Sequence, residues 1–191
     1  MADIPTHHLI YGTCTDYLTG NQVIDTDDER FRQKIARFLV EELSWPKDAI
    51  ESRRTIDTLF AGNFVQSTID FVVRHNGKRF MIIRYGPGSL VTRQRPAIAA
   101  ARVLDPDYRI PVAVVTNGKD AVVLSTADGK VLGEGLDAIP SPRQAAKLAQ
   151  TLGFEPFPEE KRERELRILN ACDKEICCIG DPCPIPGAPE G

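Results

Sequence analysis

Apolar residues recur at helical spacing between residues 26 and 44. Thr26 and Glu29 form the pattern of a capping box, in which a hydroxyl and a carboxylate each bond a backbone N–H at the start of a helix. The apolar positions that follow are Phe31, Ile35, Phe38, Leu39 and Leu43, with charged residues between them. This spacing predicts an amphipathic helix of about four turns. It ends at Ser44-Trp45-Pro46, because the residue before a proline avoids helical geometry.

The pattern then changes to short β-type runs between turn residues. Ala61-Gly62-Asn63 and Asn76-Gly77 are hairpin signals, since glycine and asparagine tolerate the positive φ that tight turns need. They predict three antiparallel strands at about residues 51–60, 64–74 and 78–85.

The second half of the chain alternates helices with buried strands. The alanine-rich stretch from Pro96 to Leu104 predicts a short helix with proline in its first turn. The apolar run 111–115 predicts a strand buried on both faces, and a hairpin follows at 121–124 and 131–132. Two helices come last, one from Ser141 to Gly153 and a charged one at about 159–170.

Length and composition favour one hydrophobic core with appendages. At 191 residues, with 42% hydrophobic and 27% charged residues, the chain suits a globular α/β protein. We divide it into an N-terminal segment (1–16), an α/β domain (17–140), a helical extension (141–178) and a tail rich in glycine and proline (179–191). No apolar run approaches the length of a membrane span and nothing marks export, so we expect a cytoplasmic protein without membrane contact.

Positive charge is concentrated in residues 71–104, which contain no aspartate or glutamate. The seven cations are Arg74, Lys78, Arg79, Arg84, Arg93, Arg95 and Arg102, so this segment carries +7 and the rest of the chain −10. The net charge of −3 argues against a protein that coats nucleic acid through net charge alone. The asymmetry nevertheless predicts an anionic partner if these groups share one face. The alternative is that they are scattered and solvated.

Three stretches resemble a known family. They are TDDERFRQKIARFLVEELSWPKDAI for the first helix, TIDFVV for the strand that carries Asp70, and PVAVVTNGKDAVVL for the later strand and hairpin. Together, from about residue 17 to 139, the chain resembles the N-terminal nuclease domain of type I restriction enzyme R subunits, a branch of the PD-(D/E)xK superfamily. The resemblance implies a restriction-endonuclease-like core of one helix, three antiparallel strands, a helix, and a buried strand plus hairpin, followed here by C-terminal helices.

The resemblance also implies a place for catalysis. In that family an aspartate on the second strand, a Glu-x-Lys on the third and usually an acid on the first helix meet around Mg²⁺, which prefers carboxylate oxygens. Asp70 matches the aspartate. The glutamate position, 14 residues later, is Arg84, and the lysine position is Gly86. Because an arginine cannot lose its proton, Arg84 reverses the charge at a metal ligand, and Asp70 is interpreted as a catalytic remnant.

These departures predict a pseudo-nuclease that binds DNA or another nucleic acid without cleaving it. The candidate nucleic-acid-binding residues are Arg84, Arg93, Gln94, Arg95 and Lys78, since guanidinium groups suit phosphate. Arg84 could instead form a structural ion pair with Asp70 or another acid. Two further functions stay open: a protein-interaction module without DNA affinity, and a Mg²⁺-dependent endonuclease with a rearranged site. In the latter, Lys78 or Arg84 would supply the cation, and Asp70 would be joined by an acid of the first helix, from among Asp27, Asp28, Glu29, Glu41 and Glu42.

Four cysteines near the C-terminus are a separate candidate. Cys172, Cys177, Cys178 and Cys183 supply enough thiolates for tetrahedral Zn²⁺, but their spacing lacks the paired CxxC pattern of zinc knuckles. A zinc site and free thiols are both open alternatives for this cluster.

Overall fold

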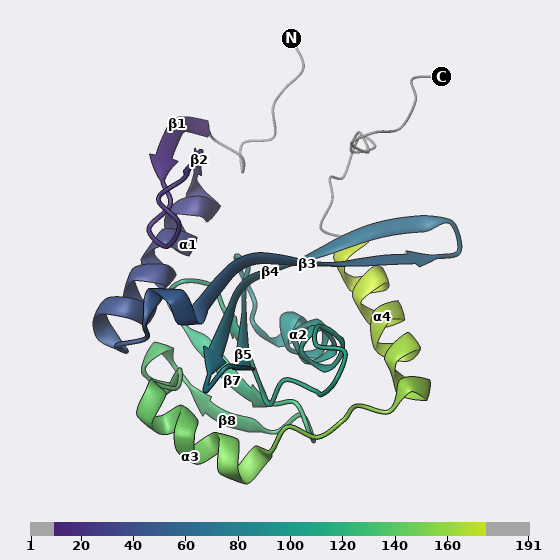
Figure 1. Cartoon of the computed structure of the whole chain (residues 1–191). Coiled ribbons are helices and arrows are strands. Elements are labelled where there is room, and N and C mark those ends of the chain that lie inside the picture. The colour runs from purple at the N-terminus through teal and green to yellow at the C-terminus, as the bar shows by residue number, and fades with distance from the viewer. Residues whose placement is uncertain (1–9, 175–191) are drawn as a thin grey trace, which may run out of the picture.

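Residues 50–134 build one six-stranded sheet in the computed structural model of the protein, which describes residues 10–174 (Figure 1). Its strands are β3 (Ile50–Phe60), β4 (Asn63–His75), β5 (Lys78–Tyr85), β6 (Val112–Thr116), β7 (Ala121–Ser125) and β8 (Val131–Glu134), and they lie side by side in that order. Neighbours are antiparallel except for β5 and β6. These two are parallel because helix α2 (Val91–Val103) carries the chain across between them.

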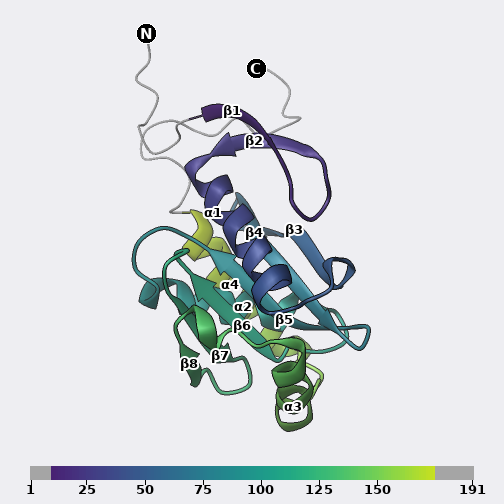
Figure 2. The same ribbon diagram turned by 90° about the vertical axis from the view of Figure 1, so that its left-hand side faces the viewer.

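Helices cover both faces of this sheet (Figure 2). One face packs against α1 (Asp27–Arg37), the π-helical turn η1 (Phe38–Glu42) and α3 (Pro142–Leu152), and the other against α2 and α4 (Glu159–Lys174). Short 3-10 turns, η2 (Lys47–Ala49) and η3 (Leu136–Ala138), precede β3 and follow β8. The predicted α/β class is confirmed.

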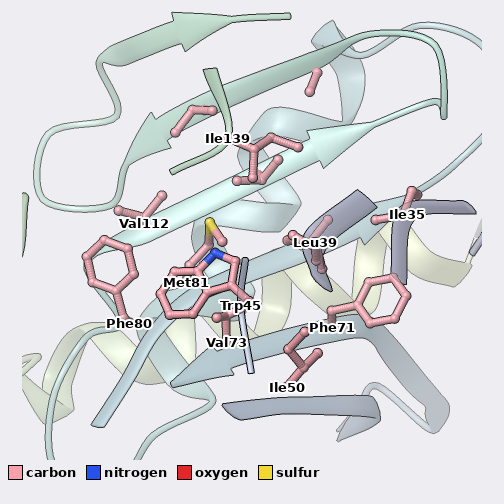
Figure 3. Close-up of a cluster of buried hydrophobic side chains, with 14 of the residues drawn as sticks. Ile35, Leu39, Trp45, Ile50, Phe71, Val73, Phe80, Met81, Val112 and Ile139 are labelled. Carbon is pink, nitrogen blue, oxygen red and sulfur yellow. The ribbon is translucent and has the colours of Figure 1, made fainter. Parts of the chain in front are cut away.

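The two faces hold separate hydrophobic clusters because the central strands are apolar on both sides. Figure 3 shows the cluster on the α1 side, where Leu39, Trp45 and Met81 lie at the centre between Ile139 and Ile50. The indole N–H of Trp45 donates to the carbonyl of Pro140 at 2.9 Å, so its one polar atom is satisfied within the core.

A hairpin near the N-terminus was not predicted. Strands β1 (Ile10–Thr15) and β2 (Gln22–Thr26) pair antiparallel as a separate sheet, and β2 runs directly into α1. Large apolar side chains on this hairpin are exposed, Ile10 at 68% and Ile24 at 60%. Because no face of the hairpin is deeply buried, its sequence lacks the alternation from which a strand is predicted.

The start of α1 confirms half of the predicted capping box. The backbone N–H of Glu29 donates to the hydroxyl of Thr26 at 3.1 Å, as expected. The carboxylate of Glu29 does not complete the box but accepts hydrogen bonds from Gln33 and Arg53. The helical segment ends before Ser44, which has φ +63°, a left-handed conformation incompatible with a continuing helix.

Helix α2 begins earlier than predicted, at Val91, so Pro96 lies in its second turn. The prediction of proline in the first turn was wrong. Proline at this place removes one intrahelical hydrogen bond. Burial of Pro96 and the apolar residues 97–101 against the sheet offsets that loss.

The helices α3 and α4 occupy the segment predicted to be helical, and α3 shows the capping box of Ser141 and Gln144. Within residues 10–174 no helix is both long and apolar enough to cross a membrane. The predicted tail, 179–191, lies outside the described residues.

Candidate functional site

Asp70 lies where the sheet branches. β4 pairs with β3 along nearly its whole length but with β5 only from Phe71 onward. Residues 54–60 and 63–69 therefore continue past β5 as a two-stranded extension, the β3–β4 arm, which projects over α4 (Figure 1). Asp70 stands at the base of this arm and is only 4% exposed.

Both carboxylate oxygens of Asp70 are engaged. Oδ1 accepts a hydrogen bond from Nε of Arg32 at 2.5 Å, and Oδ2 accepts one from the backbone N–H of Tyr85 at 2.6 Å. Another nitrogen of Arg32 lies 3.7 Å from Oε2 of Glu29 on the same helix. Burial by itself would lower the pKa of Arg32, but the charge and hydrogen bond of Asp70 raise it, so the guanidinium stays charged.

A second arginine completes a buried charge cluster beside Asp70. Arg53 donates to Asp16 at 2.7 Å and to Glu29 at 2.6 Å, and both acids are at most 5% exposed. Gln33 also donates to these two carboxylates. Arg53 has φ +52°, at the position in β3 opposite Asp70, so the strand is distorted where the cluster forms. Three carboxylates and two guanidinium groups thus share one buried region.

The ionisation of Asp16 makes the stability of this cluster depend on pH. Burial would raise the pKa of Asp16, but hydrogen bonds from Arg53, Thr19 and Gln33 outweigh it and lower the pKa from its ordinary value of 3.8 to about 2. Because the pKa of Asp16 is lower in the folded protein than in the unfolded chain, its carboxylate stabilises the folded protein fully at pH values above the unfolded-state pKa. This stabilisation is lost as pH falls from about 3.8 to 2. We expect the advantage of the wild type over Asp16→Asn to shrink by about 2 kcal/mol in this window, as measured by urea unfolding. An equal difference at pH 7 and pH 2 would contradict this assignment.

Arg84 lies near the end of β5, next to Tyr85. Because Phe71 pairs with Ile83, Arg84 is beside Asp70 across the two strands. Its side chain nevertheless pairs elsewhere, donating to both oxygens of Asp173 at 3.0 and 2.9 Å. Both side chains are largely buried, 14% and 7% exposed. The ion pair foreseen as an alternative is therefore present, with a partner from α4 rather than Asp70.

The space beside Gly86 is filled by Arg93. A Cβ atom added to Gly86 would lie 2.0 Å from a terminal nitrogen of Arg93 and 2.3 Å from its central carbon. The same guanidinium donates to the carbonyl of Pro87 at 2.9 Å. The guanidinium of Arg93, a residue of α2, thus occupies the volume that a side chain at residue 86 would need.

Arg84 and Arg93 line a cleft of about 300 Å³ at the end of β5. Its walls include Arg84, Arg93, Thr92, Tyr85, Cys172 and Asp173. The ring of Tyr85 stacks on Phe31 with centroids 5.7 Å apart, and its hydroxyl donates to Asp28. Burial and the charge of Asp28 raise the pKa of Tyr85 to about 12, so it remains a neutral hydrogen-bond donor.

The other predicted basic residues do not join this cleft. Arg95 pairs with Glu165 of α4 at 2.6 Å, and Gln94 lies beside it, partly buried on α2. Lys78 begins β5, roughly 20 Å from Arg84 at the usual rise per residue, and lies near the rings of Tyr108 and Phe154. The structure therefore brings together Arg84 and Arg93 from the predicted set and leaves Arg95 and Lys78 apart.

The acids proposed for a rearranged metal site are also separated. Glu29 is the one that shares a cation with Asp70, through Arg32. Asp27 and Asp28 bond Tyr11 and Tyr85, while Glu41 and Glu42 lie at the exposed end of the helical segment.

The residues present do not fit the Mg²⁺ that the resemblance implies. A metal ligand needs an oxygen free to face the ion, but Arg32 and the N–H of Tyr85 take both oxygens of Asp70. Over residues 10–174, no three histidine, cysteine, aspartate or glutamate side chains gather as they would around a metal.

Only one of the four cysteines predicted as zinc ligands is described. Cys172 lies on α4, partly buried, and lines the cleft. Cys177, Cys178 and Cys183 lie outside the described residues, so the zinc site stays a prediction.

The order of α1, the strands and α2 is matched by a family model. The model of the type I restriction enzyme R protein N terminus matches residues 27–140, and the chain belongs to this family. No curated protein and no solved structure matches the chain. Arg32, Asp70, Arg84 and Arg93 lie inside the matched region. Asp16, which pairs with Arg53, and Asp173, which pairs with Arg84, lie outside it.

Proposed function

We propose that the protein is a nucleic-acid-binding pseudo-nuclease that keeps a restriction-endonuclease-like core but not phosphodiester cleavage. The observation that carries the proposal is the presence of two guanidinium groups beside Asp70 and Gly86. Arg84 lies beside Asp70 across two strands, and the guanidinium of Arg93 fills the volume beside Gly86. The resemblance gives these two positions to the glutamate and the lysine of the family.

The loss of cleavage follows from charge. Carboxylates at this place would attract a divalent cation, whereas a guanidinium repels it and keeps its proton at any working pH. Asp70, the remaining acid of the motif, is held by Arg32 and the N–H of Tyr85. A metal would have to displace a buried ion pair to reach it.

Nucleic-acid binding follows from the cleft. Arg84 and Arg93 line it together with Thr92, and Asp173 offsets one of the two positive charges. A cleft with a remaining positive charge and planar donor groups suits a backbone phosphate. Such contacts position a nucleic acid but do not read its sequence, so we infer little sequence preference at this site.

The test is binding of a short labelled DNA duplex by fluorescence anisotropy across a salt series. We expect affinity to fall steeply with salt, and the double variant Arg84→Gln/Arg93→Gln to bind about tenfold to a hundredfold more weakly. The salt slope of the variant should also be lower by about one for each phosphate that it no longer binds.

The matched control is Arg143→Gln, which removes an exposed guanidinium from α3 on the opposite side of the sheet and should leave affinity nearly unchanged. Indifference of the wild type to DNA at low salt would exclude the proposal in favour of a protein-interaction module. Plasmid cleavage in Mg²⁺ or Mn²⁺ that Asp70→Ala abolishes would instead establish the endonuclease alternative.

A further inference from the structure

Two buried acids from different elements face the same cation. Glu29 comes from the first turn of α1 and is 5% exposed, and Asp70 comes from β4 and is 4% exposed. Arg32 is one turn after Glu29 on the same side of α1. Its guanidinium lies 3.7 Å from Glu29 and 2.5 Å from Asp70. A fixed positive charge therefore bridges the helix acid and the strand acid.

We propose that Arg32 is an internal counter-cation in the position where a divalent ion would lie between Glu29 and Asp70, and that this acid pair binds a divalent cation once Arg32 is removed. The inference rests on the part of the proposed function in which metal-dependent cleavage is lost, and it does not depend on nucleic-acid binding. It identifies Arg32, in addition to Arg84, as a residue that keeps metal out.

The charges of the cluster favour this exchange. Asp16, Glu29 and Asp70 face Arg32 and Arg53, so the cluster carries one net negative charge when all five groups are ionised. Without Arg32 the net charge is −2, which one divalent ion would neutralise. Magnesium and manganese ions need only one or two protein carboxylates, since bound water completes their coordination.

A purely structural ion pair predicts something different. Its loss would leave Asp70 buried and uncompensated, and the variant would be destabilised equally with and without metal. If the acid pair is a cation site, a bound metal ion should restore the stability that the positive charge of Arg32 provides. The two interpretations therefore differ in the response of the variant to metal rather than in its stability alone.

The experiment measures the Tm of full-length Arg32→Ala in EDTA and in excess Mn²⁺. We expect a Tm below that of the wild type in EDTA and a rise of about 5 °C or more with Mn²⁺, because a ligand that binds only the folded state stabilises it. The wild type should not respond. Adding Asp70→Asn to Arg32→Ala should remove the response.

The matched control is Arg37→Ala, on the same helix, whose arginine is 55% exposed, forms a surface pair with Glu41 and lies over the ring of Tyr17. It should show no effect of Mn²⁺. If Arg32→Ala is unfolded in EDTA, Mn²⁺-dependent refolding of it or of Arg32→Gln, followed by circular dichroism, supports the proposal.

Three results would overturn the proposal. They are no Mn²⁺ response in Arg32→Ala and Arg32→Gln, an equal response in the wild type, and a response that survives Asp70→Asn. None of them affects the DNA-binding measurement on Arg84 and Arg93, so this proposal and the proposed function can fail separately.

Discussion

Replacing Arg53 by methionine is expected to lower the free energy of unfolding by about 2–3 kcal/mol. Arg53 neutralises Asp16 and Glu29, whose side chains are 4% and 7% exposed, and removing it leaves two buried carboxylates short of a partner. Breaking a buried ion pair typically costs about 3–5 kcal/mol. The Arg53 side chain is itself 36% exposed, so solvent screening reduces the expected loss. Urea unfolding at neutral pH measures it.

The neighbouring residue provides the control. Arg54 is 50% exposed and lies 3.5 Å from Glu51 in a surface pair. Arg54→Met should therefore change the free energy of unfolding by no more than about 0.5 kcal/mol. The two substitutions remove the same charge from adjacent positions of one strand. Equal losses in the two variants would mean that the buried cluster contributes nothing special to stability.

Adding one methyl group at Gly86 is expected to weaken nucleic-acid binding about as much as removing the guanidinium of Arg93, roughly tenfold. The added Cβ would lie within 2.8 Å of three guanidinium atoms of Arg93 and must displace them. The displaced group is the end of a flexible side chain, so the free energy of unfolding should change little. Fluorescence anisotropy on Gly86→Ala, Arg93→Gln and the double variant measures the effect.

The double variant decides whether Gly86 acts through Arg93. If it does, Gly86→Ala/Arg93→Gln should bind no more weakly than Arg93→Gln alone, because the two changes remove one interaction. Ser89→Ala, at an exposed position in the same loop, serves as the control. Additive losses would show that Gly86 contributes by another route.

Local patterns predicted local structure well. The helix starts at Thr26 and Ser141 follow from hydrogen bonds between residues three apart in the chain, which a sequence window contains. The tight turn at Asn76-Gly77 fixes the first strand pairs, in which His75 lies opposite Lys78. A bulge between Val73 and Arg74 then shifts the register by one residue, so the place of Arg84 beside Asp70 depends on that bulge as well as on the turn.

The partners of the charged groups could not be predicted in this way. Arg32 and Asp70 are 38 positions apart, and Arg84 and Asp173 are 89 apart. No periodicity within one element contains such pairs, because they depend on how helices pack on the sheet. Only after packing does Arg32 replace Arg84 as the cation that bonds Asp70.

The acid-free window was misleading for the same reason. Residues 71–104 contain no carboxylate, which left open either one shared basic face or scattered cations. In the folded protein, acids from outside this range form ion pairs with its arginines. Glu51 pairs with Arg74 and Arg79, and Glu165 pairs with Arg95 and Arg102. A count of charge along the chain describes a neighbourhood in sequence, whereas these side chains are neutralised by neighbours in space.

The position of α4 has a practical consequence for the choice of fragments. A fragment cut at residue 140, where the family match ends, would lack Glu165 and Asp173 and so expose Arg84, Arg95 and Arg102 without their counter-charges. It would also uncover the apolar surface on which the fully buried Leu169 packs. Such a shortened protein would adsorb polyanions and self-associate for reasons that the intact chain does not share. Nucleic-acid affinities measured on the shortened protein would therefore not apply to the protein that contains α4.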